Sequence, residues 1–145
     1  MEQRVSLITL GVRDVAKARR FYEQGLGWRA SGPGNADVAF YQAGGLIVAL
    51  YAEALLARDA GRPALAVGAA PFRGVTLAHN VPNPQLVDAL LNEAERAGGR
   101  ILRPGAPAPW GGYVGTFSDP DGHLWEVAWN PGFDLRADGT VHLPR

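Results

Sequence analysis

The second half of this chain repeats the order of secondary-structure signals found in the first half, and this repeat limits the fold more than any other feature. Thr9-Leu10 in the first copy matches Thr76-Leu77 in the second. The loop before Tyr113 in the second copy is longer than the corresponding loop of the first copy. Because of that loop, the later matching positions are separated by more residues than the first pair. These matches are Phe40 with Phe117, Gly45 with Gly122 and Leu50 with Val127, and all three have the same separation. A duplicated unit decides the architecture, because each copy is expected to form the same elements in the same order.

Each copy begins with a strand, continues with a capped amphipathic helix and ends with strands joined by tight turns. Asp14 and Asn83 are the expected helix N-caps, and Pro84 suits the first helical turn, where its missing N–H is not needed. In the first copy we expect strands at residues 5–10, 28–30, 38–42 and 46–51, and helices at 15–26 and 52–60. In the second copy we expect strands at 74–78, 100–102, 113–118 and 123–129, a helix at 83–97 and a loop at 103–112.

The predicted fold class is therefore α+β, with two βαβββ modules forming a paired half-barrel within a single domain. Module 1 is expected at about residues 4–60 and module 2 at about 72–130. Residues 61–71, which are rich in Ala, Gly and Pro, form the expected connector. The tail, 131–145, is expected to form one more hairpin around Asp138-Gly139.

Composition excludes several classes of protein. The 145 residues carry 14 basic and 14 acidic side chains, so no basic patch for nucleic acid is expected. No apolar run approaches the roughly 18 residues of a membrane-spanning helix, and residues 1–5 lead into a strand without a signal-peptide core. The lack of cysteine excludes disulfides, thiolate metal sites and a cysteine nucleophile. We therefore expect a cytoplasmic protein without nucleic-acid or membrane partners.

Two segments carry a resemblance to a known family. The first is ITLGVRD at residues 8–14, followed by Phe21-Tyr22 and Leu26-Gly27-Trp28, and the second is FSDPDGHLWEV at residues 117–127. In this order, and with the internal repeat, they resemble the signatures of the vicinal oxygen chelate superfamily, which includes glyoxalase I, bleomycin-resistance proteins and extradiol dioxygenases. The resemblance implies that each module curls into a half-open sheet, that paired modules enclose a cavity for a small molecule, and that chains pair as homodimers.

In metal-dependent members of that superfamily, His, Glu or Gln ligands lie on the first and last strands of each module. The resemblance places these four positions at Leu7, Ala49, Gly74 and Glu126, so one position carries a ligand. A catalytic first-row metal usually needs about three protein ligands. We therefore expect no metal ion and no other cofactor; a metal site made by His79, Glu126 and one further residue is the remaining alternative.

Glu126 is the candidate catalytic residue and the expected polar anchor of the cavity. Strand alternation places Leu124, Glu126 and Ala128 on one face of the last strand and Trp125 and Val127 on the other. If Trp125 and Val127 pack on the helices, the carboxylate points into the cavity. There it acts as a hydrogen-bond acceptor or general base, or it is a structural residue bonded to its neighbours.

Aromatic residues supply the rest of the expected ligand-binding surface. Trp110 and Tyr113 flank two glycines on the loop that borders the pocket in the resembling family, and a Trp there offers a flat apolar face. Two roles, cavity wall or core, are open for Trp28, Phe40, Tyr51 and Phe117. Core packing is expected for Trp125 and Trp129. The predicted ligand is therefore aromatic or apolar.

The histidines and the turn at residues 119–122 offer few candidates for a ligand-binding or catalytic role. His79 and Asn80 end the first strand of module 2, where they either contact a ligand or satisfy loop backbone groups. His123 is expected in a turn, and His142 in the tail without a chemical role. The segment Asp119-Pro120-Asp121-Gly122 is a strong turn signal, so its carboxylates are expected to cap the turn rather than to catalyse.

Three functions are compatible with these features. The first is a small-molecule-binding protein without the usual metal site, as in the drug-sequestering members of the resembling superfamily. The second is a metal-dependent lyase, isomerase or dioxygenase of the glyoxalase I type. The third is a metal-free acid-base enzyme that uses Glu126 with His79 or Tyr113. The ligand count favours the first, so a binding protein is preferred over an enzyme.

Overall fold

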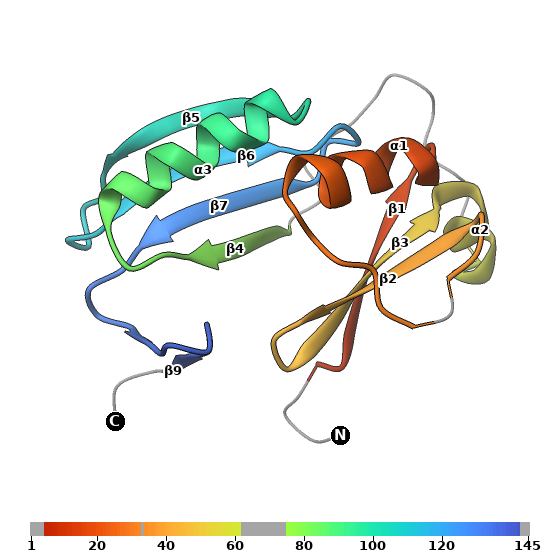
Figure 1. Cartoon of the computed structure of the whole chain (residues 1–145), viewed down its shortest axis with the longest axis horizontal. Coiled ribbons are helices and arrows are strands. Elements are labelled where there is room, and N and C mark those ends of the chain that lie inside the picture. Colours follow the sequence, from red (N-terminus) through yellow and green to blue (C-terminus); the bar gives the residue numbers. More distant parts are fainter. Residues whose placement is uncertain (1–4, 33, 62–74, 143–145) are drawn as a thin grey trace. The chain divides into compact units, whose positions relative to one another are not determined.

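The computed structural model describes residues 5–32, 34–61 and 75–142, which belong to two compact units (Figure 1). Unit 1 spans residues 1–71 and unit 2 spans residues 72–145, and each is described by itself. Unit 1 contains a three-stranded mixed sheet and unit 2 a four-stranded one, which confirms the predicted α+β class. No helix within the described ranges is long and apolar enough to cross a membrane.

Unit 1 is a mixed sheet in which a helix follows the first strand and another follows the last. Its elements are β1 (Leu7–Val12), α1 (Val15–Arg19), the π-helical segment η1 (Arg20–Gly25), β2 (Val38–Ala43), β3 (Leu46–Ala52) and α2 (Glu53–Asp59). The strand order is β1-β3-β2, with β1 parallel and β2 antiparallel to β3. The strand predicted at residues 28–30 is reduced to a single bridge between Ala30 and Tyr41.

The first helix begins where the sequence predicts and changes its winding halfway. The Asp14 side chain accepts a hydrogen bond from the Lys17 N–H at 2.9 Å and caps α1. From Arg20 to Gly25 the helix is π-helical. It ends before Gly27, whose φ of 69° lies in the left-handed region that glycine adopts without strain. The wider winding was not predicted, because apolar spacing does not distinguish the two kinds of helix over one turn.

One face of the unit 1 sheet packs against α1 and η1. Its buried side chains include Leu10, Val12, Tyr22, Tyr41 and Leu50. Burying a side chain of this size contributes about 1.5–3 kcal/mol, so packing on this helix-covered face stabilises the unit. We call it the helix face of unit 1, and we call the opposite side of the sheet its open face.

Unit 2 completes the predicted βαβββ pattern. Its elements are β4 (Thr76–Asn80), α3 (Pro84–Arg96), β5 (Arg100–Pro107), β6 (Tyr113–Ser118), β7 (Leu124–Trp129), β8 (Asp134–Leu135) and β9 (Val141–His142). The main sheet has the order β4-β7-β6-β5, with β4 parallel to β7 and the other pairs antiparallel. The short strands β8 and β9 form the hairpin predicted for the tail.

Helix α3 covers one face of the unit 2 sheet (Figure 1). Asn83 caps it by accepting from the Leu86 N–H at 3.0 Å, and Pro84 occupies the first turn as predicted. Leu91 of α3 lies directly over Gly115 of β6: a Cβ on Gly115 would lie 2.5 Å from its Cδ1 atom. Small size at Gly115 therefore lets the helix approach the sheet closely.

Strand β5 is longer than predicted, since residues 103–107 were expected to belong to a loop. The strand continues to Pro107, and its pairing with β6 shifts in register between Ile101 and Arg103 and again between Arg103 and Ala106. Pro104 lies within the second irregularity. A proline is tolerated there because it interrupts no regular pair of hydrogen bonds. The loop is thus confined to residues 108–112.

The register of the sheets corrects the internal alignment of the two halves. Thr9 lies opposite Ala49 in unit 1, and Ala78 lies opposite Glu126 in unit 2. The last strands align as predicted, with Ala49 matching Glu126. Thr9 therefore corresponds to Ala78, and the predicted match of Thr9 with Thr76 is wrong. The helix N-caps Asp14 and Asn83 follow these two strands at the same distance, which agrees with the corrected alignment.

This correction moves one of the four family ligand positions. Leu7 corresponds to Thr76 rather than to Gly74, and Gly74 lies outside the described residues. Thr76 itself is exposed on β4. The four positions are therefore held by Leu7, Ala49, Thr76 and Glu126.

The middle strands need a correction of their own. Phe40 lies opposite Ala49 in unit 1, but Thr116 lies opposite Glu126 in unit 2. Phe40 therefore corresponds to Thr116, and Phe117 corresponds to Tyr41, so the predicted match of Phe40 with Phe117 is wrong. A slip of a single position moves a side chain to the other face of the sheet.

Candidate functional site

The open face of unit 1 carries a row of residues from all three strands. Thr9, Ala49 and Phe40 lie opposite one another in register, and the neighbouring row pairs Tyr51 with Val38. Side chains that are directly opposite share a face of a sheet. The buried Leu10 and Leu50, one residue along each strand, point to the helix face.

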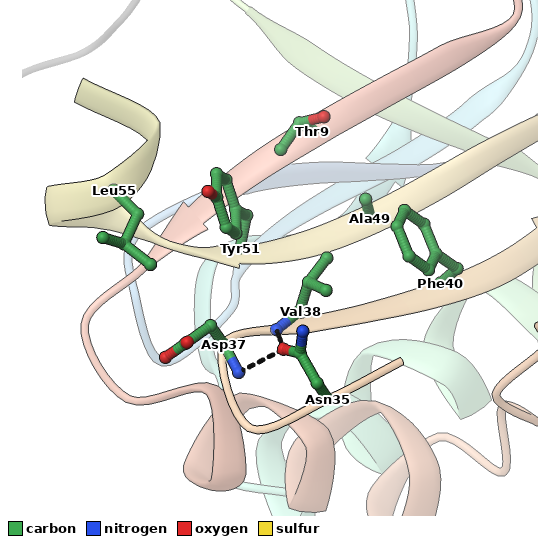
Figure 2. Close-up of a pocket in the computed structure, with 8 residues that line it drawn as sticks. All are labelled: Thr9, Asn35, Asp37, Val38, Phe40, Ala49, Tyr51 and Leu55. Carbon is green, nitrogen blue, oxygen red and sulfur yellow. Dashed lines mark hydrogen bonds between the residues drawn. The ribbon is translucent and has the colours of Figure 1, made fainter. Parts of the chain in front are cut away.

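A pocket of about 360 Å³ opens on this face (Figure 2). It is an open depression rather than an enclosed cavity, and its size falls within the range of about 300–1,000 Å³ that is usual for ligand sites. Its lining consists of Thr9, Asn35, Asp37, Val38, Phe40, Ala49, Tyr51 and Leu55. Two of the predicted aromatic wall residues, Phe40 and Tyr51, are thus brought together.

The pocket exists because small residues lie beneath it and α2 closes one end. Ala49, at the centre of the row, has a methyl group where a longer side chain would fill the space. Gly11 of β1 lets α2 approach, since a Cβ there would lie 3.2 Å from Leu56 Cδ2. Leu55 of the same helix reaches the pocket, opposite the end formed by Phe40 (Figure 2).

The rim of the pocket is held by a turn built on Asn35. Its Oδ1 atom accepts from the N–H of Asp37 at 2.8 Å and from the N–H of Val38 at 3.1 Å (Figure 2). The Asn35 N–H donates to the Val38 carbonyl at 2.9 Å, and the Ala52 N–H donates to the Asp37 carbonyl at 3.0 Å. The backbone of Asp37 is therefore fixed from both sides.

Tyr51 connects the pocket to an exposed charged pair. Its hydroxyl donates to Asp59 Oδ2 at 2.9 Å, and Arg58 contacts the other oxygen of the same carboxylate at 3.1 Å. The pKa of Tyr51 is raised because the hydroxyl donates to Asp59, and burial and the negative charges of Asp59 and Asp37 raise it further. The ring of Tyr51 is held in place by this bond.

The open face of unit 2 carries a different row. Ala78, Glu126, Thr116 and Arg103 lie opposite one another across β4, β7, β6 and β5. Glu126 is half-buried, and no hydrogen bond or ion pair joins its carboxylate to any residue of the described ranges. It is therefore not the structural residue bonded to neighbours that the sequence left as an alternative, as far as those ranges extend.

The faces of β7 agree with the strand alternation. Trp125 is 8% and Val127 is 1% exposed, and both lie on the side covered by α3. Glu126 consequently points away from the helix, as predicted. Trp129, also predicted as core, is half-buried.

Three predicted ligand contacts lie on the helix face of unit 2 instead of its open face. The Tyr113 hydroxyl donates to the Asp88 carboxylate of α3 at 3.2 Å. Phe117 is buried and stacks on Trp125, with ring centroids 6.3 Å apart. His79 lies opposite Val127 in register. For Phe117 the core alternative therefore holds, and Tyr113 and His79 point to the side opposite Glu126.

The environment of His79 is mixed. Contact with neighbouring protein atoms covers part of the ring, and this burial lowers the pKa of His79, although the rest of the side chain stays exposed. The neutral imidazole is thus favoured. Asn80, its neighbour, lies on the same face as Glu126, opposite Ala128 of β7.

The two remaining predicted contacts are tryptophans outside the pocket. Trp28 packs on the helix side of unit 1, with its ring centroid 5.1 Å from that of Tyr22 and 5.5 Å from that of Tyr41. The core alternative holds for it. Trp110 is 51% exposed on the β5–β6 loop, and its indole ring lies directly over Gly112.

The turn between β6 and β7 is a structural feature, as predicted. Asp119 is buried and accepts from the N–H groups of Asp121 at 2.9 Å and His123 at 2.8 Å. These bonds occupy the carboxylate in holding the turn. The side chain of His142, predicted to have no chemical role, lies outside the described residues.

Sequence reasoning missed most of the polar pocket lining. Asn35 and Asp37 lie between the strands predicted at residues 28–30 and 38–42, and neither they nor Val38 and Leu55 were proposed as ligand contacts. Strand alternation applied to β2 and β3 would have placed Val38, Phe40, Ala49 and Tyr51 together. The spacing of Asn35 and Asp37 is typical of a turn, but only the fold brings it beside the sheet.

Comparison with known proteins decides the family. Residues 4–127 match the Glyoxalase/Bleomycin resistance protein/Dioxygenase superfamily. The chain belongs to this superfamily. A glyoxalase-related enzyme from Fulvimarina pelagi is 37% identical, with a TM-score of 0.88 and coverage of 99% of this chain and 100% of that one. A search of curated proteins gives no match.

Other solved structures of the glyoxalase superfamily are more distant. A glyoxalase/bleomycin resistance protein/dioxygenase from Nocardioides is 26% identical, covering 91% of this chain and 87% of that one, with a TM-score of 0.73. Lactoylglutathione lyase from Agrobacterium tumefaciens is 18% identical, covering 89% and 95%, with a TM-score of 0.64. The second likeness shows the fold alone.

At the four positions to which the sequence resemblance assigns metal ligands, the side chains present do not supply the donor set of a first-row metal ion. Leu7 and Ala49 offer no donor atom, Thr76 offers a neutral hydroxyl, and Glu126 offers a carboxylate. Such metals take imidazole, carboxylate or thiolate ligands, about three at a time. Within residues 5–32, 34–61 and 75–142, no three His, Asp or Glu side chains are grouped so that they could hold a metal ion.

Proposed function

We propose that this chain binds a small aromatic or apolar molecule in the open-face pocket of unit 1, and that it does so without the metal ion of the glyoxalases. The observation that carries this proposal is the pocket itself. It combines the rings of Phe40 and Tyr51 and the aliphatic side chains of Val38 and Leu55 with a few fixed polar groups. This combination is typical of small-molecule sites.

The proposal extends to the biological role. A protein that holds a flat toxic compound and performs no chemistry on it protects the cell by sequestration, and the superfamily description includes bleomycin resistance proteins. We propose such a sequestering or drug-resistance role in the cytoplasm, with the chain acting as a homodimer. The donor set at the four metal positions supports a metal-free protein.

Binding is tested with N-phenyl-1-naphthylamine, a neutral apolar dye whose fluorescence rises when it leaves water. Ala49→Leu places three additional carbons into the pocket and is expected to weaken dye binding at least about tenfold. Ala78→Leu is the matched control, because it adds the same side chain to the open face of unit 2, and it is expected to leave binding unchanged. Equal binding by both variants would refute the pocket as the binding site.

Metal content is tested on protein purified without chelator. We expect no stoichiometric Ni, Zn, Fe or Mn by elemental analysis, and dye binding that is insensitive to chelator. A stoichiometric transition metal that is lost in Glu126→Gln would contradict the proposal. It would instead support a metal-dependent lyase, isomerase or dioxygenase.

A metal-free acid-base enzyme is the second candidate, and Glu126 is the observation that favours it. Its carboxylate lies on an open face without a hydrogen-bond partner in the described ranges, beside the Thr116 hydroxyl in register. An unoccupied carboxylate is available to accept a proton from a bound substrate. Lactoylglutathione lyase activity, named for the Agrobacterium tumefaciens protein, is the first to assay. Turnover that survives chelator and is lost in Glu126→Gln would favour this candidate over simple binding.

A further inference from the structure

We infer that the open-face pocket of unit 1 selects aromatic ligands that carry a positive charge, such as aryl ammonium compounds. The inference rests on the proposed function, because it names the chemical class of the molecule bound there. Two features carry it: the carboxylate of Asp37 at the rim, and the two aromatic rings of the wall, Phe40 and Tyr51.

Asp37 is the charged residue among the eight that line the pocket. Its carboxylate has no hydrogen bond or ion pair to any residue in the described part of the chain. The neighbouring carboxylate, Asp59, differs in this respect, because Arg58 and the Tyr51 hydroxyl occupy it at 3.1 and 2.9 Å. The pocket therefore presents one uncompensated negative charge to a ligand.

The negative field of Asp37 extends to the wall of the pocket. Tyr51 lies opposite Val38, the residue after Asp37, so the phenol ring and the carboxylate are at the same end of the pocket. Figure 2 shows Asp37, Leu55 and Tyr51 around this end, with Phe40 and Ala49 at the other. The negative charge of Asp37 contributes to the raised pKa of Tyr51, which is the effect a nearby carboxylate has on a phenol.

Aromatic rings add a second attraction for a cation. The face of a Phe or Tyr ring carries partial negative charge and attracts an ammonium group within about 6 Å of its centroid. A ligand with a flat apolar body would rest on Phe40, Val38 and Ala49, and its ammonium group would lie between Tyr51 and Asp37. An anionic ligand at the same end would meet the carboxylate and the negative ring faces, and it would be repelled.

The backbone that carries this side chain is held in position before any ligand arrives. The Asp37 N–H donates to Asn35 Oδ1, and its carbonyl accepts from the Ala52 N–H. A backbone fixed on both sides loses little freedom when the side chain pairs with a ligand, so the attraction is offset less by ordering. The exposed carboxylate of Asp37 thus extends from a fixed point of the backbone at the rim of the pocket.

The experiment compares three naphthalene probes that share one ring system: 1-naphthylmethylammonium, 1-naphthalenemethanol and 1-naphthoate. Binding is measured by calorimetry near neutral pH. We expect the cation to bind about tenfold more tightly than the alcohol, and the anion to bind most weakly. In Asp37→Asn the advantage of the cation is expected to fall to about twofold.

Two further variants make the result interpretable. Asp37→Glu keeps the charge and is expected to keep the preference for the cation, which excludes a folding defect as the cause of the loss. Asp134→Asn changes the net charge equally on the exposed strand β8 of unit 2, where Asp134 pairs with Arg136, and it is expected to change nothing.

The outcomes separate the inference from the proposed function. If all three probes bind equally to the unaltered protein, charge selection is wrong while the binding pocket stands. If the preference for the cation persists in Asp37→Asn, the assignment to Asp37 is wrong. If none of the probes binds, the pocket is not a ligand site and both proposals fail.

Discussion

In unit 1 the row of residues across the open face is Thr9, Ala49 and Phe40, whereas the corresponding row of unit 2 is Ala78, Glu126 and Thr116. The first row surrounds a pocket, and the second carries a carboxylate. The helix faces of the two units are much more alike, since both are filled by buried apolar and aromatic side chains. Packing against a helix restricts a residue to apolar types, and the opposite face is released from that restriction.

The largest expected effect is a loss of stability, and it compares the same substitution, Phe to Ala, on the helix face and on the open face. Phe117 is buried on the helix face of unit 2, and Phe40 is half-buried on the open face of unit 1. We expect Phe117→Ala to lower the free energy of unfolding by about 3–5 kcal/mol and Phe40→Ala by about 1 kcal/mol. Urea denaturation measures both. Similar losses would show that the two faces are equally packed.

The next effect comes from exchanging the central residues of the two rows. Ala49 is 2% exposed, so Ala49→Glu buries a carboxylate without a partner and is expected to cost about 2–4 kcal/mol of stability. Glu126→Ala removes a half-buried carboxylate that has no partner in the described ranges, and is expected to change stability by less than about 1 kcal/mol.

Denaturation curves of the two variants, taken in the same buffer, test this contrast. A large loss in Glu126→Ala would mean that the carboxylate has a stabilising contact. A small loss in Ala49→Glu would mean that the pocket of unit 1 admits enough water to hydrate a charge.

The smallest effect concerns the carboxylate of Glu23 on the helix face of unit 1, which accepts hydrogen bonds from two side chains. Tyr41 donates to Glu23 Oε1 at 3.0 Å and Arg19 donates to the same oxygen at 2.7 Å, whereas unit 2 has Phe117 at the position of Tyr41. The hydrogen bond from Arg19, with a smaller contribution from Tyr41, lowers the pKa of Glu23. The stability that Glu23 contributes is therefore present above its unfolded pKa and is lost as the pH falls through its folded pKa.

We expect Glu23→Gln to cost about 0.5–1 kcal/mol near neutral pH, because the ion pair is partly exposed and screened by solvent. The cost is expected to shrink as the pH falls toward about 3, because protonation removes the charge of Glu23 in the unaltered protein, whereas the Gln variant carries no charge there at any pH. Glu95→Gln on the exposed side of α3 is the control and is expected to have no effect. A cost that does not change with pH would mean that the charge of Glu23 is not involved.

The elements of the fold could be predicted from the sequence because their signals are local. Asp14 and Asn83 cap helices through contacts three residues away, and the Asp119 turn is closed by its own side chain. Strand alternation in β7 also placed Glu126 away from α3. Each of these depends on residues close to one another in the chain.

The face of a residue depends on register, which local signals do not determine. Phe40 and Phe117 match in sequence but lie on opposite faces of their sheets. The extension of β5 through Pro104 required bulges that only pairing with β6 reveals. Three of the eight residues that line the pocket, Asn35, Asp37 and Leu55, come from a turn or a helix that tertiary structure brings to the sheet.

The unequal hairpins have a practical consequence for exchanging pieces between the units. Two residues join β2 to β3, whereas five join β6 to β7, and the strands on either side of these turns follow different numerical offsets. A chimera that transplants the β6–β7 hairpin must therefore be aligned strand by strand. If one constant offset were used for both strands, every side chain of one strand would move to the opposite face of the sheet. The helix would then lose the apolar side chains against which it packs.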